Sequence, residues 1–116
     1  MTVHLPGITP PRGANVAIRI EVTAQANITP FVARQTVTGF VIREISDRLR
    51  GEEPQLVVGD RLCWSVPVVL TSPTRGDVGK VGEVLVDATT GELLVEKDTV
   101  QRLSHDADRL AERAPL

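Results

Sequence analysis

Cys63 is the strongest nucleophile among the side chains of this 116-residue sequence. A thiol becomes catalytic when a nearby base or positive charge favours the thiolate. The only histidines are His4 and His105, and no sequence pattern places either of them beside Cys63. We therefore predict that Cys63 is a buried structural residue without a catalytic role. As the only cysteine, it also excludes an intramolecular disulfide.

A metal ion could be held by His105, Asp106 and Asp108, which cluster near the C-terminus. Two ligands on one helix need a spacing of three or four residues, so that their side chains share a face. Only His105 and Asp108 meet this spacing, and two ligands on a solvated face rarely form a site. The sequence therefore predicts a polar helix surface here, with no metal and no cofactor.

A glycine-rich segment around Gly76 and Gly79 has the composition of a phosphate-binding loop. Glycines allow backbone amides to converge on an anion, and Arg75 and Lys80 could supply positive charge. A nucleotide-hydrolysing loop needs Ser or Thr after its Gly-Lys pair and then a helix, whereas valine follows here and the next residues alternate as a strand. We therefore exclude nucleotide hydrolysis. We expect residues 72–81 to form a hairpin loop, either a plain mobile connection or a loop that binds a partner or an anion.

A further candidate site is a pocket between a helix and the sheet. Ligand pockets need a few polar groups that converge in an apolar hollow. The residues that could supply them are Arg61, Cys63, Trp64 and Glu83. Such a pocket would make the protein a small enzyme or a ligand-binding protein, which is the main alternative to a module without chemistry.

The elements that must position these residues follow from hydrophobic periodicity. Apolar residues alternate over residues 15–23 and 61–71, as in strands with one buried face. Over residues 29–50 they recur at spacings of three and four, as in an amphipathic helix. Pro67 indicates that its strand lies at an edge or carries a bulge. The remaining expected elements are an extended stretch at residues 55–58, a strand at 83–87, its hairpin partner at 92–95 and a helix that starts near Asp98.

The long helix has recognisable start and stop signals. Thr29 is a typical N-cap and Pro30 a typical first helical residue, while Gly51 followed by Pro54 is a typical stop. Many residues of this segment are β-branched, which lowers helix propensity, so packing against a sheet must compensate. Gly39, in the middle of the helix, indicates either the close approach of a strand or neutral drift.

These elements predict the fold class. Short connections between strands indicate an antiparallel sheet, and the long helix should cover one of its faces. We expect a two-layer α+β domain over residues 14–116, with a sheet of about 4–5 strands on one long helix and an additional C-terminal helix. Residues 1–13 are rich in proline and glycine and are expected to form an extended N-terminal arm.

Residues 86–94 read Val-Asp-Ala-Thr-Thr-Gly-Glu-Leu-Leu. This segment resembles the closing hairpin of PepSY-type domains, where a strand ends in Val-Asp-Ala-x-Thr-Gly-Glu followed by a hydrophobic residue and leucine. The amphipathic helix and the strand with Trp64 precede it roughly where such a domain has them. The resemblance implies a non-catalytic role, since these small modules bind or inhibit partners such as peptidases.

Composition and charge narrow the function further. The net charge is -2, which argues against a basic nucleic-acid binder, and two Phe and one Trp are too few for stacking on single strands. The sequence has neither a long apolar run nor the pattern of a signal peptide, so we expect a cytoplasmic protein without membrane contact.

The sequence therefore favours a non-catalytic binding or regulatory module that acts through protein contacts or self-association as a homodimer. Besides the pocket, one more alternative stays open. A regulator of the toxin–antitoxin type would touch nucleic acid through Arg75 and Lys80, although the net charge disfavours it.

Overall fold

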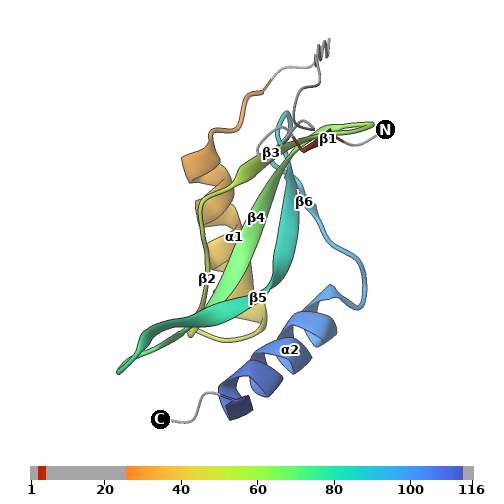
Figure 1. Ribbon diagram of the computed structural model, residues 1–116. Coiled ribbons are helices and arrows are strands. Elements are labelled where there is room, and N and C mark those ends of the chain that lie inside the picture. Colours follow the sequence, from red (N-terminus) through yellow and green to blue (C-terminus); the bar gives the residue numbers. More distant parts are fainter. Residues whose placement is uncertain (1–2, 5–25, 114–116) are drawn as a thin grey trace, which may run out of the picture.

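The computed structural model describes residues 3–4 and 26–113. They form an α+β fold in which an antiparallel sheet carries two helices, which confirms the predicted fold class (Figure 1). The elements in chain order are β1 (Val3–His4), α1 (Pro30–Glu44), β2 (Leu49–Gly51), β3 (Gln55–Val58), β4 (Leu62–Ser72), β5 (Gly76–Asp87), β6 (Leu93–Leu94) and α2 (Thr99–Arg113).

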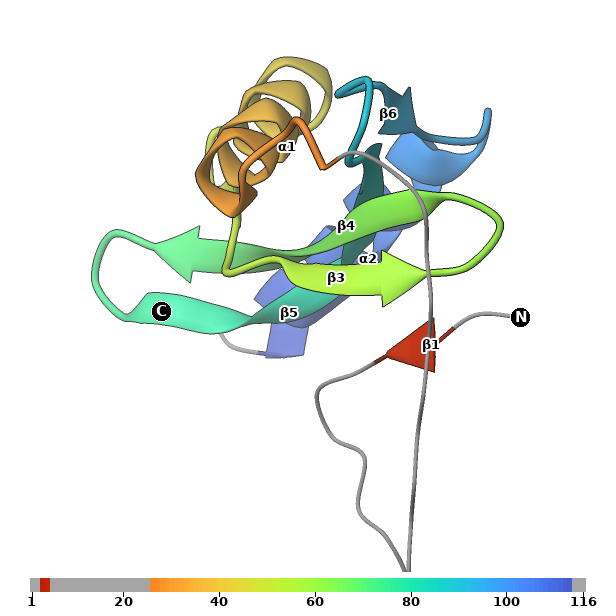
Figure 2. The same ribbon diagram turned by 90° about the horizontal axis from the view of Figure 1, so that it is seen from above.

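The sheet is built around the long hairpin of β4 and β5. On its other side β4 pairs with β3 and, further along, with β2. β1 extends the sheet beyond β3, and β6 extends it beyond β5. The sequence patterns predict neither β1 nor β2, because strands of two or three residues are too short to show an alternation. The tip of the β4–β5 hairpin reaches beyond both helices (Figure 2).

Pro67 lies in the interior strand β4, so an edge strand is the wrong expectation. Its carbonyl accepts a hydrogen bond from the Glu52 N–H (2.8 Å) at the gap between β2 and β3. The Pro67 nitrogen points to the same side of the strand as its carbonyl and therefore faces this gap. Proline has no N–H to donate, but no hydrogen bond between paired strands is lost at this position. The irregularity that proline indicates is present, since the register shifts between Val68 and Val69.

Both helices cover the same face of the sheet. Val68 pairs with Gly51 on one side and with Gly82 on the other, so these three residues point to one face. A Cβ atom at Gly51 would lie 3.2 Å from the Thr38 hydroxyl oxygen of α1, and one at Gly82 would lie 2.7 Å from Leu103 Cδ2 of α2. The buried core between helices and sheet consists of Ala33, Val37, Phe40, Val41, Leu49, Val66, Val68, Leu70, Val84, Val86, Leu103 and Ala107.

α1 begins as predicted. The Thr29 hydroxyl accepts a hydrogen bond from the Val32 N–H (3.1 Å), and Pro30 opens the helix where no donor is needed. The inner face of the helix carries the predicted apolar stripe, whose buried members are Ala33, Val37, Phe40 and Val41.

The end of α1 differs from the prediction. The helix ends at Glu44 and not at residue 50. Leu49 continues the helical spacing in the sequence but is buried from β2, where it pairs with Leu70. Gly51, the expected stop signal, is part of the same strand. An apolar residue such as Leu49 can be buried from a helix or from a strand. Its pairing with β4 determines that it belongs to a strand.

The predicted loop over residues 72–81 is also wrong except for its first part. A turn at residues 73–75 connects the two strands, and β5 begins at Gly76. Glycines further along β5 have a packing role, since a Cβ at Gly79 would lie 3.1 Å from Leu110 Cδ2 of α2. The glycine-rich composition therefore reflects a helix that lies close to the strand.

The C-terminal half agrees better with the sequence patterns. Gly91 closes the β5–β6 hairpin with a φ of 82°, and its N–H donates to the Asp87 carbonyl (2.8 Å). The predicted C-terminal helix is present as α2, which buries Leu103 and Ala107. The predicted strand at residues 15–23 and the arm at residues 1–13 lie outside the described residues, apart from β1.

Candidate binding groove

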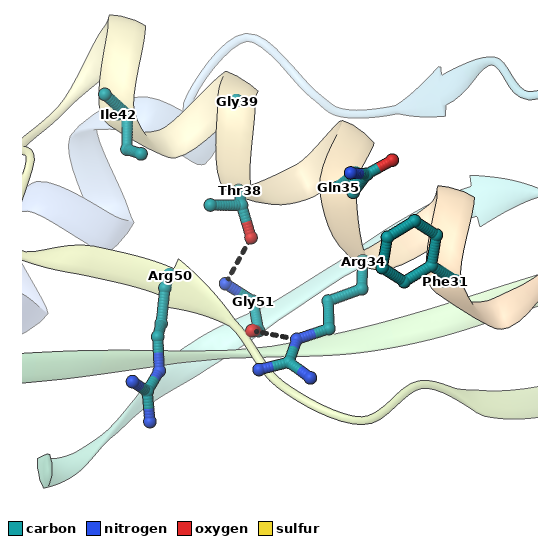
Figure 3. A pocket seen from close by; sticks show the side chains of 8 residues that line it. All are labelled: Phe31, Arg34, Gln35, Thr38, Gly39, Ile42, Arg50 and Gly51. Atoms are coloured by element: carbon teal, nitrogen blue, oxygen red, sulfur yellow. Dashed lines mark hydrogen bonds between the residues drawn. The ribbon is translucent and has the colours of Figure 1, made fainter.

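A groove of about 420 Å³ runs between the outer side of α1 and the strand β2 (Figure 3). It is open along the surface and does not form a closed cavity. The residues that line it are Phe31, Arg34, Gln35, Thr38, Gly39, Ile42, Arg50 and Gly51.

The floor of the groove is held by hydrogen bonds between α1 and Gly51. The Thr38 hydroxyl accepts from the Gly51 N–H (2.9 Å), and Arg34 Nε donates to the Gly51 carbonyl (2.9 Å). A Cβ at this position would lie 2.9 Å from Val66 Cγ1 and 3.2 Å from the Arg34 carbonyl oxygen, so only glycine fits. The outward backbone groups of Gly51 are thus already used, and another strand cannot pair with them.

Ion pairs neutralise the cations beside the groove. Arg50 contacts both Glu52 (2.8 Å) and Asp77 (2.6 Å), and Arg34 lies 3.4 Å from Glu52. The hydrogen bond from Arg50 is the main reason why the pKa of Glu52 is lowered, against the opposing effect of burial. These side chains are partly exposed, so each pair adds little stability. They leave the border of the groove with balanced charge.

The outer face of α1 carries apolar residues that the fold does not bury. Phe31 is 67% exposed, Ile42 45% and Val32 41%. Between Phe31 and Ile42 lies Gly39, where a Cβ would meet only Arg43 Nη1 at 3.5 Å, an ordinary contact. No strand of the described residues approaches Gly39 closely, and Gly51 is the residue that allows α1 and the sheet to approach each other. Glycine costs about 1 kcal/mol in a helix interior relative to alanine.

Cys63 is buried, as predicted. Burial raises the pKa of its thiol, and the nearby Asp87 carboxylate raises it further, so the thiolate is disfavoured. Asp87 itself is occupied by the hairpin turn: the Thr90 and Thr89 N–H groups donate to its carboxylate and lower its pKa. Arg61 lies 3.5 Å from the other carboxylate oxygen. This cluster has the geometry of a turn, with a thiol held in its protonated form.

The structure does not bring Trp64 and Glu83 to that cluster. Trp64 follows Cys63 along β4 and points to the opposite face, where its indole N–H donates to the Ile28 carbonyl (2.7 Å). Glu83 forms an ion pair with Lys80 (2.7 Å). The four residues of the expected pocket therefore lie in separate environments.

The residues of the expected anion-binding loop are also spread out. Arg75 belongs to the turn, Gly76 follows it with a φ of 74°, and both are exposed. Gly79 pairs with Leu70 and Lys80 with Val69, so both belong to the β4–β5 ladder. Paired strand residues do not form a concave nest of amides.

His105, Asp106 and Asp108 lie on the exposed side of α2. Within residues 26–113 no three His, Cys, Asp or Glu side chains gather closely enough to hold a metal ion. No helix in the described part of the chain is both long and apolar enough to cross a membrane.

Sequence reasoning missed the groove, although one signal was present. Phe31, Gln35, Gly39 and Ile42 follow each other at spacings of four, four and three, which places them on one face of a helix. This face lies opposite the buried stripe and contains no charge. The charged residues Arg34 and Arg43 flank it, which makes the outer side of the segment look ordinary in the sequence.

No protein-family model matches this sequence, and neither a curated protein nor a solved structure matches it significantly.

Proposed function

We propose that the protein is a non-catalytic protein-binding module that contacts its partner through the outer face of α1 and the adjoining groove. The observation that carries this proposal is the exposure of Phe31 and Ile42 on either side of Gly39. Large apolar side chains around a hollow are typical of interaction sites and rare on an otherwise charged surface.

The geometry favours an apolar helix as the partner segment. The exposed residues repeat at helical spacing, and a partner helix can approach closely where Gly39 has no side chain. Strand addition beside the groove is disfavoured because the backbone groups of Gly51 already bond to Thr38 and Arg34. The Arg34 and Arg50 guanidinium groups are already paired with carboxylates of the same chain. The groove therefore does not favour a partner with acidic side chains.

A small-molecule site has less support. The groove volume lies within the range of about 300–1,000 Å³ for ligand pockets. The groove is open, however, so a small ligand in it would stay in contact with solvent. The separation of Cys63, Trp64 and Glu83 supports neither an enzyme nor a pocket at those residues.

Two expectations from the sequence are carried into this proposal. A module that binds or inhibits a protein fits the role implied by the PepSY-type resemblance of residues 86–94. The single cysteine, which leaves the fold independent of disulfides, fits a cytoplasmic location.

The test is a selection from a display library of helical peptides, with the purified protein held at nanomolar concentration as bait. We expect enrichment of peptides with an apolar ridge, and Phe31→Asp should weaken their binding tenfold or more, a loss of about 1.4 kcal/mol. Isothermal titration with synthetic versions of the selected peptides measures the affinities.

Val95→Asp is the matched control, because it places the same charge on an apolar side chain that is 40% exposed but lies at the other edge of the sheet. Peptides that bind both variants and the wild type equally would overturn the proposal. Circular dichroism on both variants verifies that they fold.

A further inference from the structure

We infer that the partner helix is α1 of a second copy of this chain, so that two antiparallel α1 helices pack across a two-fold axis beside Gln35. This inference rests on the proposed function, because it uses the same face of α1. It goes further by naming the partner and the residues that meet.

The spacing of the exposed residues is self-complementary about Gln35. Phe31 lies four residues before Gln35, and Gly39 lies four residues after it. In an antiparallel pair centred on Gln35, Phe31 of one chain therefore faces Gly39 of the other. A two-fold axis repeats each contact, so the most exposed apolar side chain fills a hollow twice.

The register extends to the neighbouring residues. About the same centre, Thr38 faces Val32 of the second copy, and Val32 is 41% exposed in the single chain. Ile42 lies opposite position 28 of the second copy, which precedes the start of that helix, and Ile28 packs against its own core and the Gly91 turn. The contacts between the two helices therefore run from Phe31 to Gly39. Residues four apart form the ridges that interdigitate when helices cross in the commonest packing class.

The proposed dimer explains why residue 39 is glycine, which the contacts within one chain do not. Within the described residues, a Cβ at Gly39 would touch only the flexible end of Arg43. Packing among the described residues therefore does not require glycine at this position, in contrast to Gly51. A second helix that brings an aromatic ring to this point does require it.

Charge does not oppose the contact of two identical faces. The stripe itself has no ionised group, and Arg34 and Arg50 at its border are paired with Glu52 and Asp77. Two copies can thus approach without a net repulsion between these paired groups. Arg43, whose Nη1 would lie 3.5 Å from a Cβ at Gly39, must turn toward solvent as Phe31 of the second copy enters.

Sedimentation equilibrium over a range of concentrations measures the proposed assembly. We expect the wild type to reach twice the chain mass of 12.6 kDa. Phe31→Asp should stay at the single-chain mass, and Val95→Asp should assemble like the wild type. Gly39→Leu separates the two roles of the position, because leucine favours the helix but fills the hollow. It should raise the melting temperature of the monomer and weaken the dimer at least tenfold.

Cross-linking tests the register. Gln35→Cys places two thiols at the axis, so oxidised glutathione should convert the variant to a disulfide-linked dimer, with the glutathione reduced in turn. Glu44→Cys, nine residues further along α1, is the matched control and should stay uncross-linked.

The outcomes separate the two proposals. A wild type that is monomeric at all concentrations but binds helical peptides at Phe31 overturns the dimer and leaves the binding face in place. A dimer that Phe31→Asp and Gly39→Leu do not weaken overturns the dimer interface at α1. If Phe31→Asp also has no effect on peptide binding, the proposed function fails as well.

Discussion

α1 and α2 resemble each other on their inner faces and differ on their outer faces. Each has 15 residues, and both contribute buried side chains to one core. The exposed side of α2 carries one small apolar residue, Ala111, and is otherwise polar and charged, with Gln101, Arg102, His105, Asp106, Asp108, Arg109, Glu112 and Arg113. The outer face of α1 carries Phe31, Gln35, Gly39 and Ile42 instead. The apolar residues on the inner faces are needed for the core. On the outer faces, α2 has the polar residues expected of a helix in contact with water, whereas α1 exposes large apolar side chains.

The largest expected effect concerns the inner faces. Leu103→Ala should lower the free energy of unfolding by about 3 kcal/mol and Val37→Ala by about 2 kcal/mol, because each removes buried volume from the shared core. Urea unfolding followed by the fluorescence of Trp64 measures both. Val95→Ala, at an exposed position, is the control. A loss below about 0.5 kcal/mol for Leu103→Ala would mean that α2 is not part of the core.

The next effect concerns how closely each helix approaches the sheet. Gly51→Ala should cost about 2 kcal/mol, because the added carbon meets both Val66 and the backbone oxygen of Arg34. Gly82→Ala should cost about 1 kcal/mol or less, since it meets only the end of the Leu103 side chain, which can rotate. Chemical unfolding compares the two variants. Equal losses would contradict a tighter contact at α1.

A smaller effect appears with pH. The pKa of Glu52 is lowered in the folded protein, mainly by the hydrogen bond from Arg50, so its ion pairs stabilise the fold above the pKa of the unfolded chain. This contribution is lost as the pH falls through the folded value. Glu52→Gln should therefore be less stable than the wild type by up to about 1 kcal/mol at neutral pH, and the difference should vanish in acid. Urea unfolding along a pH series at low salt tests this, and a difference independent of pH would contradict it.

The smallest effect is expected on α2. Asp98 and Arg102 form an ion pair four residues apart, and both side chains are more than half exposed. Asp98→Asn should cost about 0.3–0.5 kcal/mol at low salt and nothing at high salt, since solvent and ions screen the pair. Thermal unfolding at both salt concentrations measures the change. If Asp98→Asn lowered the free energy of unfolding as much as Glu52→Gln does, the ion pairs beside α1 and on α2 would be equally important for stability, which would contradict the prediction.

Local signals in the sequence account for the parts of the fold that were predicted well. The start of α1 needs only Thr29 and Pro30, and the hairpin after β5 needs only a residue that adopts a positive φ, which Gly91 supplies. The buried stripe of α1 is visible because a helix repeats every 3.6 residues. These features depend on residues that are neighbours in the chain, so composition and spacing are sufficient.

The groove could not be predicted in the same way. Its floor depends on Gly51, which the sequence presents as the end of a helix. Its outer wall depends on Gly39, which no strand of residues 26–113 covers. Neither fact is local, because both depend on which segments meet across the core.

The sequence by itself determined the fold class, the start of α1, the β5–β6 hairpin and the burial of Cys63. Only the tertiary structure decided that Leu49 belongs to a strand, that Pro67 faces a gap in the ladder and that the glycines of β5 make room for α2. The physical reason is that aliphatic residues and glycines can adopt helix, strand or turn conformations with small differences in free energy. The partner that packs against them selects one, and that partner lies far away in the chain.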